Sequence, residues 1–205
     1  MKRFKKISLA VLLITLFFLL IIYNCFIHNF SSVIPHQIYR SGELSQKQLE
    51  HIIKTYQIRS IINLRGAHPQ LPWYQNELTV THAAKIAHYD ISLSSYKLPT
   101  PETLTQLIDV LMHAAQPILV HCNSGVDRTS FASMIGLILY QKSKPTLLEK
   151  QISWRYFVFR TDSVGKQVLS IYKDWLTKNH LKSCKKHFLQ WVEQYDPQAS
   201  FRPKQ

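Results

Sequence analysis

The sequence predicts an α/β domain with a central, mostly parallel sheet flanked by helices and preceded by one transmembrane helix. Three observations support this prediction. Short apolar segments typical of buried strands alternate with longer segments of helical periodicity, which is the usual order in a parallel sheet covered by helices. A polar loop at residues 121–129 joins one such strand to one such helix. Residues 7–27 are almost continuously apolar and contain no charged side chain.

The apolar segment 7–27 is long enough to cross the hydrocarbon core of a bilayer as a helix. Four Lys and Arg residues precede it, whereas none follows it until Arg40. This asymmetry predicts a cytoplasmic N-terminus and an exoplasmic domain, which would be periplasmic in a bacterium. A cleaved signal peptide is the competing interpretation, but no small-residue cleavage site follows the segment. We therefore expect an uncleaved, single-pass signal anchor.

The chain divides into five parts around this anchor. Residues 28–36 are expected to form a short polar spacer, and the remainder is long enough for one domain with a hydrophobic core. The expected parts are a cytoplasmic basic N-terminus at 1–6, the anchor at 7–27, the spacer at 28–36, a folded domain at 37–196 and a tail at 197–205.

The expected strands are short, and most are apolar and rich in β-branched residues. They span residues 37–40, 58–64, 88–93 and 117–120. Helices are expected between and after them. Ser45 caps the first helix, a weakly patterned one covers about 74–86, and Thr100 caps the next, which Pro101 opens. Another helix follows the polar loop, and the chain beyond it contains helices with apolar stripes at 168–175 and 188–195.

The polar loop His121-Cys122-Asn123-Ser124-Gly125-Val126-Asp127-Arg128-Thr129 contains the chemistry that the sequence predicts. A chain that reverses between a strand and a helix turns backbone N–H groups inward and forms an anion site. At the base of this site, the helix dipole and the Arg128 charge favour the thiolate of Cys122. The guanidinium of Arg128 matches two oxygens of a phosphate. These groups together predict a phosphate-transfer site.

This loop resembles the signature of the cysteine-dependent protein tyrosine and dual-specificity phosphatases, His-Cys-x-x-Gly-x-x-Arg-Ser/Thr. Two supporting patterns, Tyr39-Arg40-Ser41-Gly42 and Ile61-Ile62-Asn63-Leu64-Arg65, resemble the bacterial and fungal atypical dual-specificity members. Ser130 departs from the pattern, because family members usually carry Gly there.

The resemblance implies a two-step mechanism without a metal or other cofactor. Cys122 attacks phosphorus and forms a phosphocysteine, which water then hydrolyses. Thr129 donates a hydrogen bond to the departing sulfur, and His121 orients the loop. Arg128 and the loop amides hold the phosphate oxygens. The phosphate-binding residues are expected to be Asn123, Ser124, Gly125, Val126, Asp127 and Arg128.

Two aspartates are candidates for the general acid. Related enzymes carry an acid about thirty residues before the cysteine, where the only aspartate is Asp90, within a predicted strand. The alternative is Asp127 inside the loop, as in the myotubularin lipid phosphatases, which the pattern Cys-x-x-Gly-x-Asp-Arg-Thr resembles. Asp127 could instead orient Arg128 or cap the helix. The sequence favours Asp127 narrowly.

The whole chain carries a formal net charge of +13, and basic residues clearly outnumber acidic ones from Lys142 onward. A basic surface beside a membrane suits anionic lipid headgroups and attracts phosphorylated substrates. Recognised nucleic-acid-binding motifs are absent from the sequence, so we expect no nucleic-acid partner. The histidines are scattered and do not pair with cysteines at metal-ligand spacing, so we expect no metal site.

These features predict a membrane-anchored phosphatase, with a phosphotyrosine or dual-specificity protein substrate as the first interpretation. The second is a phospholipid or inositol-phosphate phosphatase, favoured by the anchor and by Asp127. The third is an inactive phosphate-binding module, which the intact Cys122, Gly125, Arg128 and Thr129 argue against.

Overall fold

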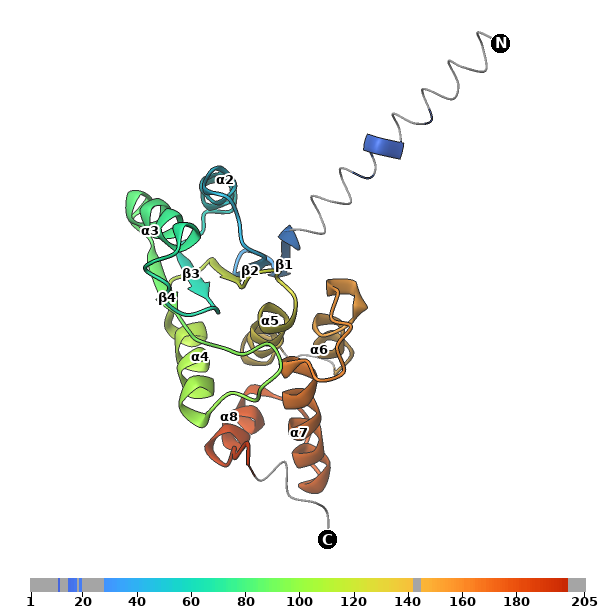
Figure 1. Ribbon diagram of the computed structural model, residues 1–205. Helices are drawn as coiled ribbons and strands as arrows, with labels where there is room; N and C mark the ends of the chain where they lie inside the picture. The colour runs from blue at the N-terminus through green and yellow to red at the C-terminus, as the bar shows by residue number, and fades with distance from the viewer. Residues whose placement is uncertain (1–10, 12–14, 18, 20–27, 142–144, 199–205) are drawn as a thin grey trace, which may run out of the picture.

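The computed structural model describes residues 11, 15–17, 19, 28–141 and 145–198. Five strands form one sheet in the order β1-β2-β5-β3-β4 (Figure 1). The strands are β1 (Ser31–Ile34), β2 (Ile38–Ser41), β3 (Ser60–Asn63), β4 (Ala87–Asp90) and β5 (Ile118–His121). Neighbouring strands from β2 to β4 are parallel, whereas β1 pairs with β2 in the antiparallel direction. The predicted α/β fold is confirmed, and the antiparallel edge strand makes the sheet mixed.

Helices cover both faces of the sheet (Figure 1). Two lie on one face, α2 (Gln46–Tyr56) and α3 (Pro72–Ala84). The other side holds α4 (Pro101–His113), α5 (Asp127–Tyr140), α6 (Pro145–Gln151), α7 (Val164–Lys178) and α8 (Lys185–Glu193), with the short 3-10 helix η1 (Trp154–Tyr156) after α6. The caps predicted from the sequence form: the Ser45 N–H donates to the Gln48 side chain, and the Thr100 hydroxyl accepts from the Thr103 N–H.

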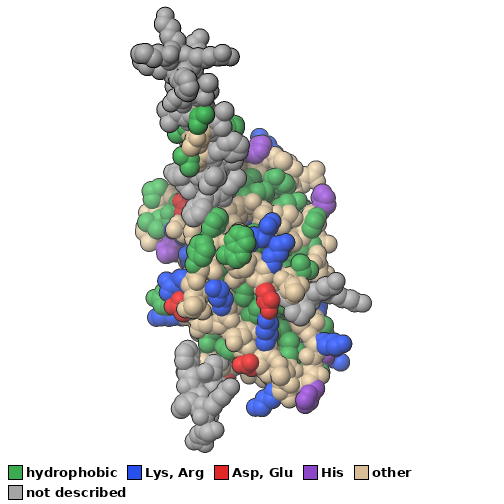
Figure 2. Space-filling view, turned by 90° about the vertical axis from the view of Figure 1, so that its right-hand side faces the viewer, with side chains coloured by type: hydrophobic (Ala, Val, Ile, Leu, Met, Phe, Trp, Pro, Cys, Tyr) green, Lys and Arg blue, Asp and Glu red, His purple; other side chains and the backbone are tan. Residues whose placement is uncertain are grey.

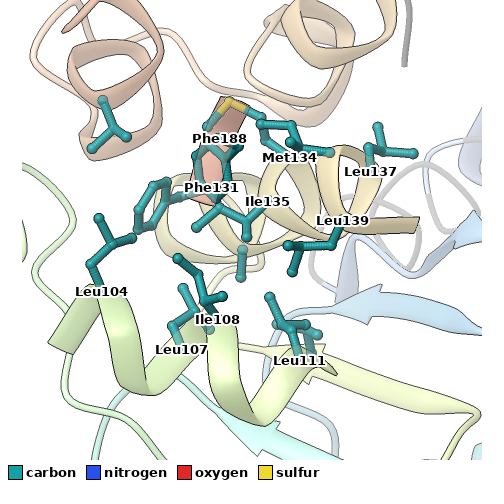
Figure 3. Close-up of a cluster of buried hydrophobic side chains, with 14 of the residues drawn as sticks. Leu104, Leu107, Ile108, Leu111, Phe131, Met134, Ile135, Leu137, Leu139 and Phe188 are labelled. Carbon is teal, nitrogen blue, oxygen red and sulfur yellow. The ribbon is translucent and has the colours of Figure 1, made fainter. Parts of the chain in front are cut away.

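Side chains alternate between the two faces along each strand, as the pleat of a sheet requires. Ile61 packs with α2 and α3, whereas its neighbour Ile62 packs into the larger core on the opposite face. That larger core surrounds α5, whose residues 129–139 are all buried. Figure 3 shows the α5 side chains Phe131, Ile135 and Leu139 among neighbours from α4, with Phe188 of α8 beside them. Because α5 is packed into this core along its length, its first turn is held in place next to the end of β5.

The segment expected to be a polar spacer, 28–36, differs from the prediction. Residues 31–34 form β1, in which Val33 and Ile34 are buried, and the side chain of Asn29 is also buried. The sequence gives a weak signal here because a short edge strand beginning with two serines lacks an apolar run. The folded domain therefore includes residues before position 37.

Most of the predicted transmembrane segment 7–27 lies outside the described residues. Within the described part of the chain, none of the helices combines the length and apolarity that crossing a bilayer requires. The surface on the side of α6 and α7 carries separate basic side chains rather than one continuous basic patch (Figure 2). There, Lys and Arg side chains are spread among apolar, uncharged and acidic ones, and two of them form ion pairs, Arg160 with Asp162 and Lys173 with Glu149.

Candidate active site

The loop between β5 and α5 leaves the sheet at the carboxyl end of a central parallel strand. This is the usual position for ligand sites in such sheets. Two of its carbonyl groups face away from the loop. The Asn123 oxygen accepts from the Glu43 N–H at 2.8 Å, and the Gly125 oxygen accepts from Asn29 Nδ2 at 2.8 Å. In a trans peptide the next N–H points the opposite way. The N–H groups of Ser124 and Val126 are therefore directed toward the interior of the loop.

Gly125 adopts a left-handed backbone conformation with φ +68°. A Cβ atom at this position would lie 2.6 Å from the Gly42 nitrogen and 2.7 Å from the Ser41 carbonyl carbon. Both neighbours are backbone atoms at the end of β2, so they cannot yield as a flexible side chain would. The loop thus requires glycine at position 125 for both its conformation and its close contact with β2.

Cys122 lies at the base of the loop and is 2% exposed. Burial opposes ionisation of its thiol. Hydrogen bonding from the Thr129 side chain, the Arg128 charge and the backbone N–H groups of Thr129 and Gly125 outweigh this effect, so that the pKa of Cys122 is lowered. The structure therefore places a thiol that ionises readily where the sequence predicts the nucleophile.

Arg128 lies in the first turn of α5, half-buried beside the loop. Its Nη1 is 3.5 Å from the carbonyl oxygens of Leu64 and Leu93. Its Nε is buried and has no hydrogen-bond partner within the described residues. These two long contacts hold the guanidinium over the ends of β3 and β4 while leaving donors for an anion.

His121 forms a buried ion pair behind the loop. Its Nε2 lies 3.0 Å from Glu77 Oε2 on α3, and the other oxygen of Glu77 is 2.7 Å from His88 Nε2. Burial disfavours the imidazolium, but the Glu77 carboxylate and the Cys122 thiolate outweigh it and raise the pKa of His121. Burial also opposes ionisation of Glu77, but His121 and His88 together lower its pKa to about 2. The raised pKa favours the imidazolium form of His121, which places positive charge next to Cys122.

The two candidate general acids occupy different environments. Asp127 begins α5 inside the loop, and its Oδ1 is buried without a hydrogen-bond partner in the described part of the chain. Asp90 ends β4, two strands away from His121 in the sheet register. Its carboxylate accepts from Asn63 Nδ2 at 2.7 Å and from the Tyr74 hydroxyl at 2.5 Å. Only Asp127 lies within the loop that contains Cys122 and Arg128.

A pocket of about 600 Å³ opens beside the loop. One wall consists of Asn123, Ser124 and Val126, while Trp73 and Phe157 contribute aromatic rings. Among the described residues, the lining includes Glu43 but no Lys or Arg. Outside the lining, Arg65 pairs with Glu43 and stacks on the Trp73 ring, with 3.6 Å from its guanidinium carbon to the ring centroid. The space next to the loop is therefore partly aromatic and weakly charged.

The sequence did not single out several residues that support the loop. Arg40 is fully buried and donates to the Gly125 oxygen at 2.5 Å, where Asn29 also donates. Glu77 holds His121 from α3. The pattern Tyr39-Arg40-Ser41-Gly42 was the only signal pointing to any of them. Within the described residues, no group of three or more His, Cys, Asp or Glu side chains is arranged to hold a metal ion.

A family model described as "DSP-PTPase phosphatase fused to NAD+ Kinase" matches residues 29–163, a range that contains the whole loop. The chain belongs to this family. It is accordingly a cysteine-based phosphatase of the dual-specificity phosphatase superfamily, which confirms the resemblance drawn from the loop. The family match also includes β1, in agreement with the observed start of the sheet.

Relatives of this phosphatase include the inositol diphosphatase Siw14 of Saccharomyces cerevisiae, 29% identical over 153 residues. That alignment covers 71% of this chain and 51% of Siw14, so the chain spans about half the length of its curated relative. The crystal structure of the Siw14 catalytic core has a TM-score of 0.56 at 24% identity, covering 74% of this chain and 93% of the core. Pseudomonas aeruginosa TpbA has a TM-score of 0.51 at 14% identity, covering 84% and 88%. These two structural similarities concern the fold.

Proposed function

We propose that this phosphatase hydrolyses phosphate monoesters through a phosphocysteine at Cys122. The observation that supports this most strongly is the buried Cys122 thiol, whose pKa the Thr129 and Arg128 contacts lower despite burial. In the first step a P–S bond forms and the P–O bond to the leaving group breaks, with Asp127 protonating the departing oxygen. In the second step Asp127 takes a proton from water, which attacks phosphorus. The P–S bond breaks, phosphate leaves and the thiolate is restored.

The first proposed substrate class is protein phosphotyrosine, with phosphoserine and phosphothreonine as further possible residues. The pocket beside the loop supports this class. Trp73 and Phe157 line it with aromatic side chains that suit an aromatic leaving group, and no Lys or Arg is among the described residues of the lining. A highly charged ligand would need several cations there, because burying unpaired phosphate charge is costly.

The second proposed class is an inositol phosphate or the headgroup of an anionic phospholipid. Sequence similarity to the inositol diphosphatase Siw14 supports this class. Arg65 beside the pocket is the cation that would contact an additional phosphate, while Arg128 at the loop holds the phosphate that is transferred. For this substrate class, Arg65 would have to leave its ion pair with Glu43 and bind a phosphate of the substrate.

One experiment separates these classes from each other and from an inactive binding module. The full chain and its Cys122→Ser variant are given a phosphotyrosine peptide, a phosphoserine peptide, an inositol diphosphate and a phosphatidylinositol phosphate at equal concentration. We expect turnover of at least one, no turnover by Cys122→Ser, and radiolabelled phosphorus trapped on Cys122 after acid quench. If the protein binds phosphate but releases none from any substrate, the enzyme assignment fails.

Residues 7–27 are proposed to anchor the enzyme, with its catalytic domain on the exoplasmic side. The support comes from the apolar sequence and the basic residues that precede it. Extraction of membranes with alkaline carbonate, followed by protease protection of the sealed vesicles, tests both the anchor and its orientation. Release of the protein by carbonate would refute the anchor.

A further inference from the structure

Arg40 on β2 is a fully buried cation behind the phosphate loop. Its Nη2 donates to the Gly125 oxygen at 2.5 Å and to Ser130 Oγ at 3.0 Å, and its Nη1 donates to Gln151 Oε1 at 3.0 Å. The Tyr156 ring lies 3.8 Å from its guanidinium carbon. Among the described residues, no carboxylate forms an ion pair with it. A buried charge without a carboxylate partner is costly, so its position calls for an explanation beyond packing.

The first consequence of this position is geometric. Arg40 and Asn29 both donate to the Gly125 carbonyl and hold its oxygen on the side away from the loop interior. Because the peptide unit is planar and trans, the Val126 N–H then points into the loop. Ser130, the residue at the position where related phosphatases usually carry Gly, supplies a hydroxyl that helps hold the same guanidinium. The direction of one anion-binding N–H is therefore fixed from outside the loop.

The second consequence is electrostatic. Burial lowers the pKa of Arg40 to about 10, while Tyr156 and the Cys122 thiolate act in the opposite direction. Arg40 thus stays charged at neutral pH, and its charge interacts with Cys122. Other charged groups also surround Cys122 from neighbouring elements. Arg128 on α5 and His121 on β5 act on it directly, while Glu77 on α3 pairs with His121 and Asp127 begins α5 in the same loop.

We propose that Arg40 is a positioning residue that turns the Gly125–Val126 peptide toward the substrate phosphate and stabilises the Cys122 thiolate from behind the loop. This proposal rests on the phosphocysteine mechanism. It assigns two separable effects to one side chain: the hydrogen-bonding fork orients the peptide, and the charge favours the thiolate.

The test compares four variants of the full chain. Arg40→Met removes both the guanidinium hydrogen bonds and the positive charge. Arg40→Lys removes the guanidinium hydrogen bonds but keeps the charge. Asn29→Ala removes the neutral donor to the same carbonyl. Gln151→Met is the matched control, because it removes a contact at Nη1 and leaves the Gly125 contact intact. Three properties are measured: the pH midpoint of Cys122 alkylation by iodoacetamide, mapped by mass spectrometry, the inhibition constant of vanadate, and the melting temperature.

We expect Arg40→Met to raise the alkylation midpoint by about one pH unit and to weaken vanadate inhibition about tenfold or more. Arg40→Lys should keep the midpoint near wild type and still weaken vanadate. Asn29→Ala should also keep the midpoint near wild type and weaken vanadate inhibition to a smaller extent. Gln151→Met should change only the melting temperature. If Arg40→Met destabilises the protein too far to assay, Arg40→Lys and Asn29→Ala still test the effect on vanadate binding.

Two failures are distinguishable. If the Arg40 variants melt at lower temperature but keep the wild-type midpoint and vanadate inhibition, Arg40 is merely structural and the proposal is overturned. If Cys122→Ser retains turnover, or alkylation of Cys122 leaves wild-type activity intact, the phosphocysteine mechanism itself is wrong.

Discussion

The Tyr74 hydroxyl donates a hydrogen bond to Asp90 Oδ2 across 2.5 Å, from α3 to the end of β4. Burial and the neighbouring carboxylates of Asp90 and Glu77 raise the pKa of Tyr74 to about 12. The hydroxyl therefore remains a hydrogen-bond donor at every pH at which the enzyme would be assayed. Asn63 donates to the other oxygen of Asp90. Both carboxylate oxygens of Asp90 thus accept hydrogen bonds from neighbouring side chains, which suits a structural role on the edge strand. Asp127, in contrast, lies in the loop that contains Cys122.

Asp127→Asn is expected to lower kcat about a hundredfold on substrates with poor leaving groups, because it removes the proton donor. The basic limb of the pH–rate profile should disappear with it. Asp90→Asn keeps an oxygen that can accept from Tyr74, and it should retain that limb with a modest loss of rate. The two profiles are measured with a phosphopeptide. Loss of the basic limb in Asp90→Asn alone would reverse the assignment.

Gly125→Ala should distort the phosphate loop. The new Cβ would lie 2.6 Å from the Gly42 nitrogen, and a non-glycine residue at this φ adds strain of about 1–3 kcal/mol. Because small displacements of reacting groups cost about a hundredfold in rate, we expect kcat/KM to fall at least that far. Gly136→Ala is the control, since its Cβ would contact only the flexible end of Ile38. Equal losses in both variants would contradict this account.

Glu77→Gln should destabilise the fold at neutral pH by about 3 kcal/mol, because it leaves the buried His121 unpaired. The Glu77 pKa falls from 4.5 to about 2, so its contribution is complete above pH 4.5 and is lost as pH falls toward 2. The His121 pKa is raised, so its contribution is present below pH 6.5 and is lost as pH rises through the folded value. Urea unfolding between pH 2 and 9 should show wild type and variant converging at low pH. A constant difference at every pH would refute this pairing.

Thr129→Val removes the hydroxyl that favours the Cys122 thiolate while nearly keeping the side-chain volume. The thiol pKa should rise, since hydrogen bonding from this hydroxyl helps to lower it. Breakdown of the phosphocysteine should slow about tenfold or more, because the departing sulfur loses a donor. Rapid-quench measurement with an aryl phosphate should then show a burst of the phenol followed by a slow steady rate. A uniform slowing without a burst would place the effect on the first step instead.

The central features were predictable because strong local signals coincide there. The sequence around Cys122 combines an apolar strand, the signature glycine Gly125 and a helical apolar pattern, and the structure has the predicted strand and helix. The predicted helices with good caps, such as the one opened by Pro101, also begin where expected. The central strands lie within about two residues of their expected ends, since buried parallel strands are short and apolar.

The contributions of distant residues were not predictable from the sequence. The pattern Tyr39-Arg40-Ser41-Gly42 pointed to Arg40 but not to its burial or its contacts, because arginine is rarely buried in full and its partners Gly125 and Gln151 lie far away in the chain. Glu77 sits in a weakly patterned helix, and only the tertiary fold brings it to His121. Residues 31–34 form a strand because β2 offers an open edge, a condition that local sequence does not record.

The phosphate loop also depends on residues that the ribosome adds later. Asn29 donates to the Tyr156 carbonyl as well as to Gly125, and the Tyr156 ring covers Arg40. A nascent or proteolytically shortened chain that stops before Tyr156 would contain every residue of the loop yet lack the rear support of its geometry. We therefore expect catalytic activity to appear in one step rather than gradually. It should appear only when the chain beyond η1 has folded against the loop.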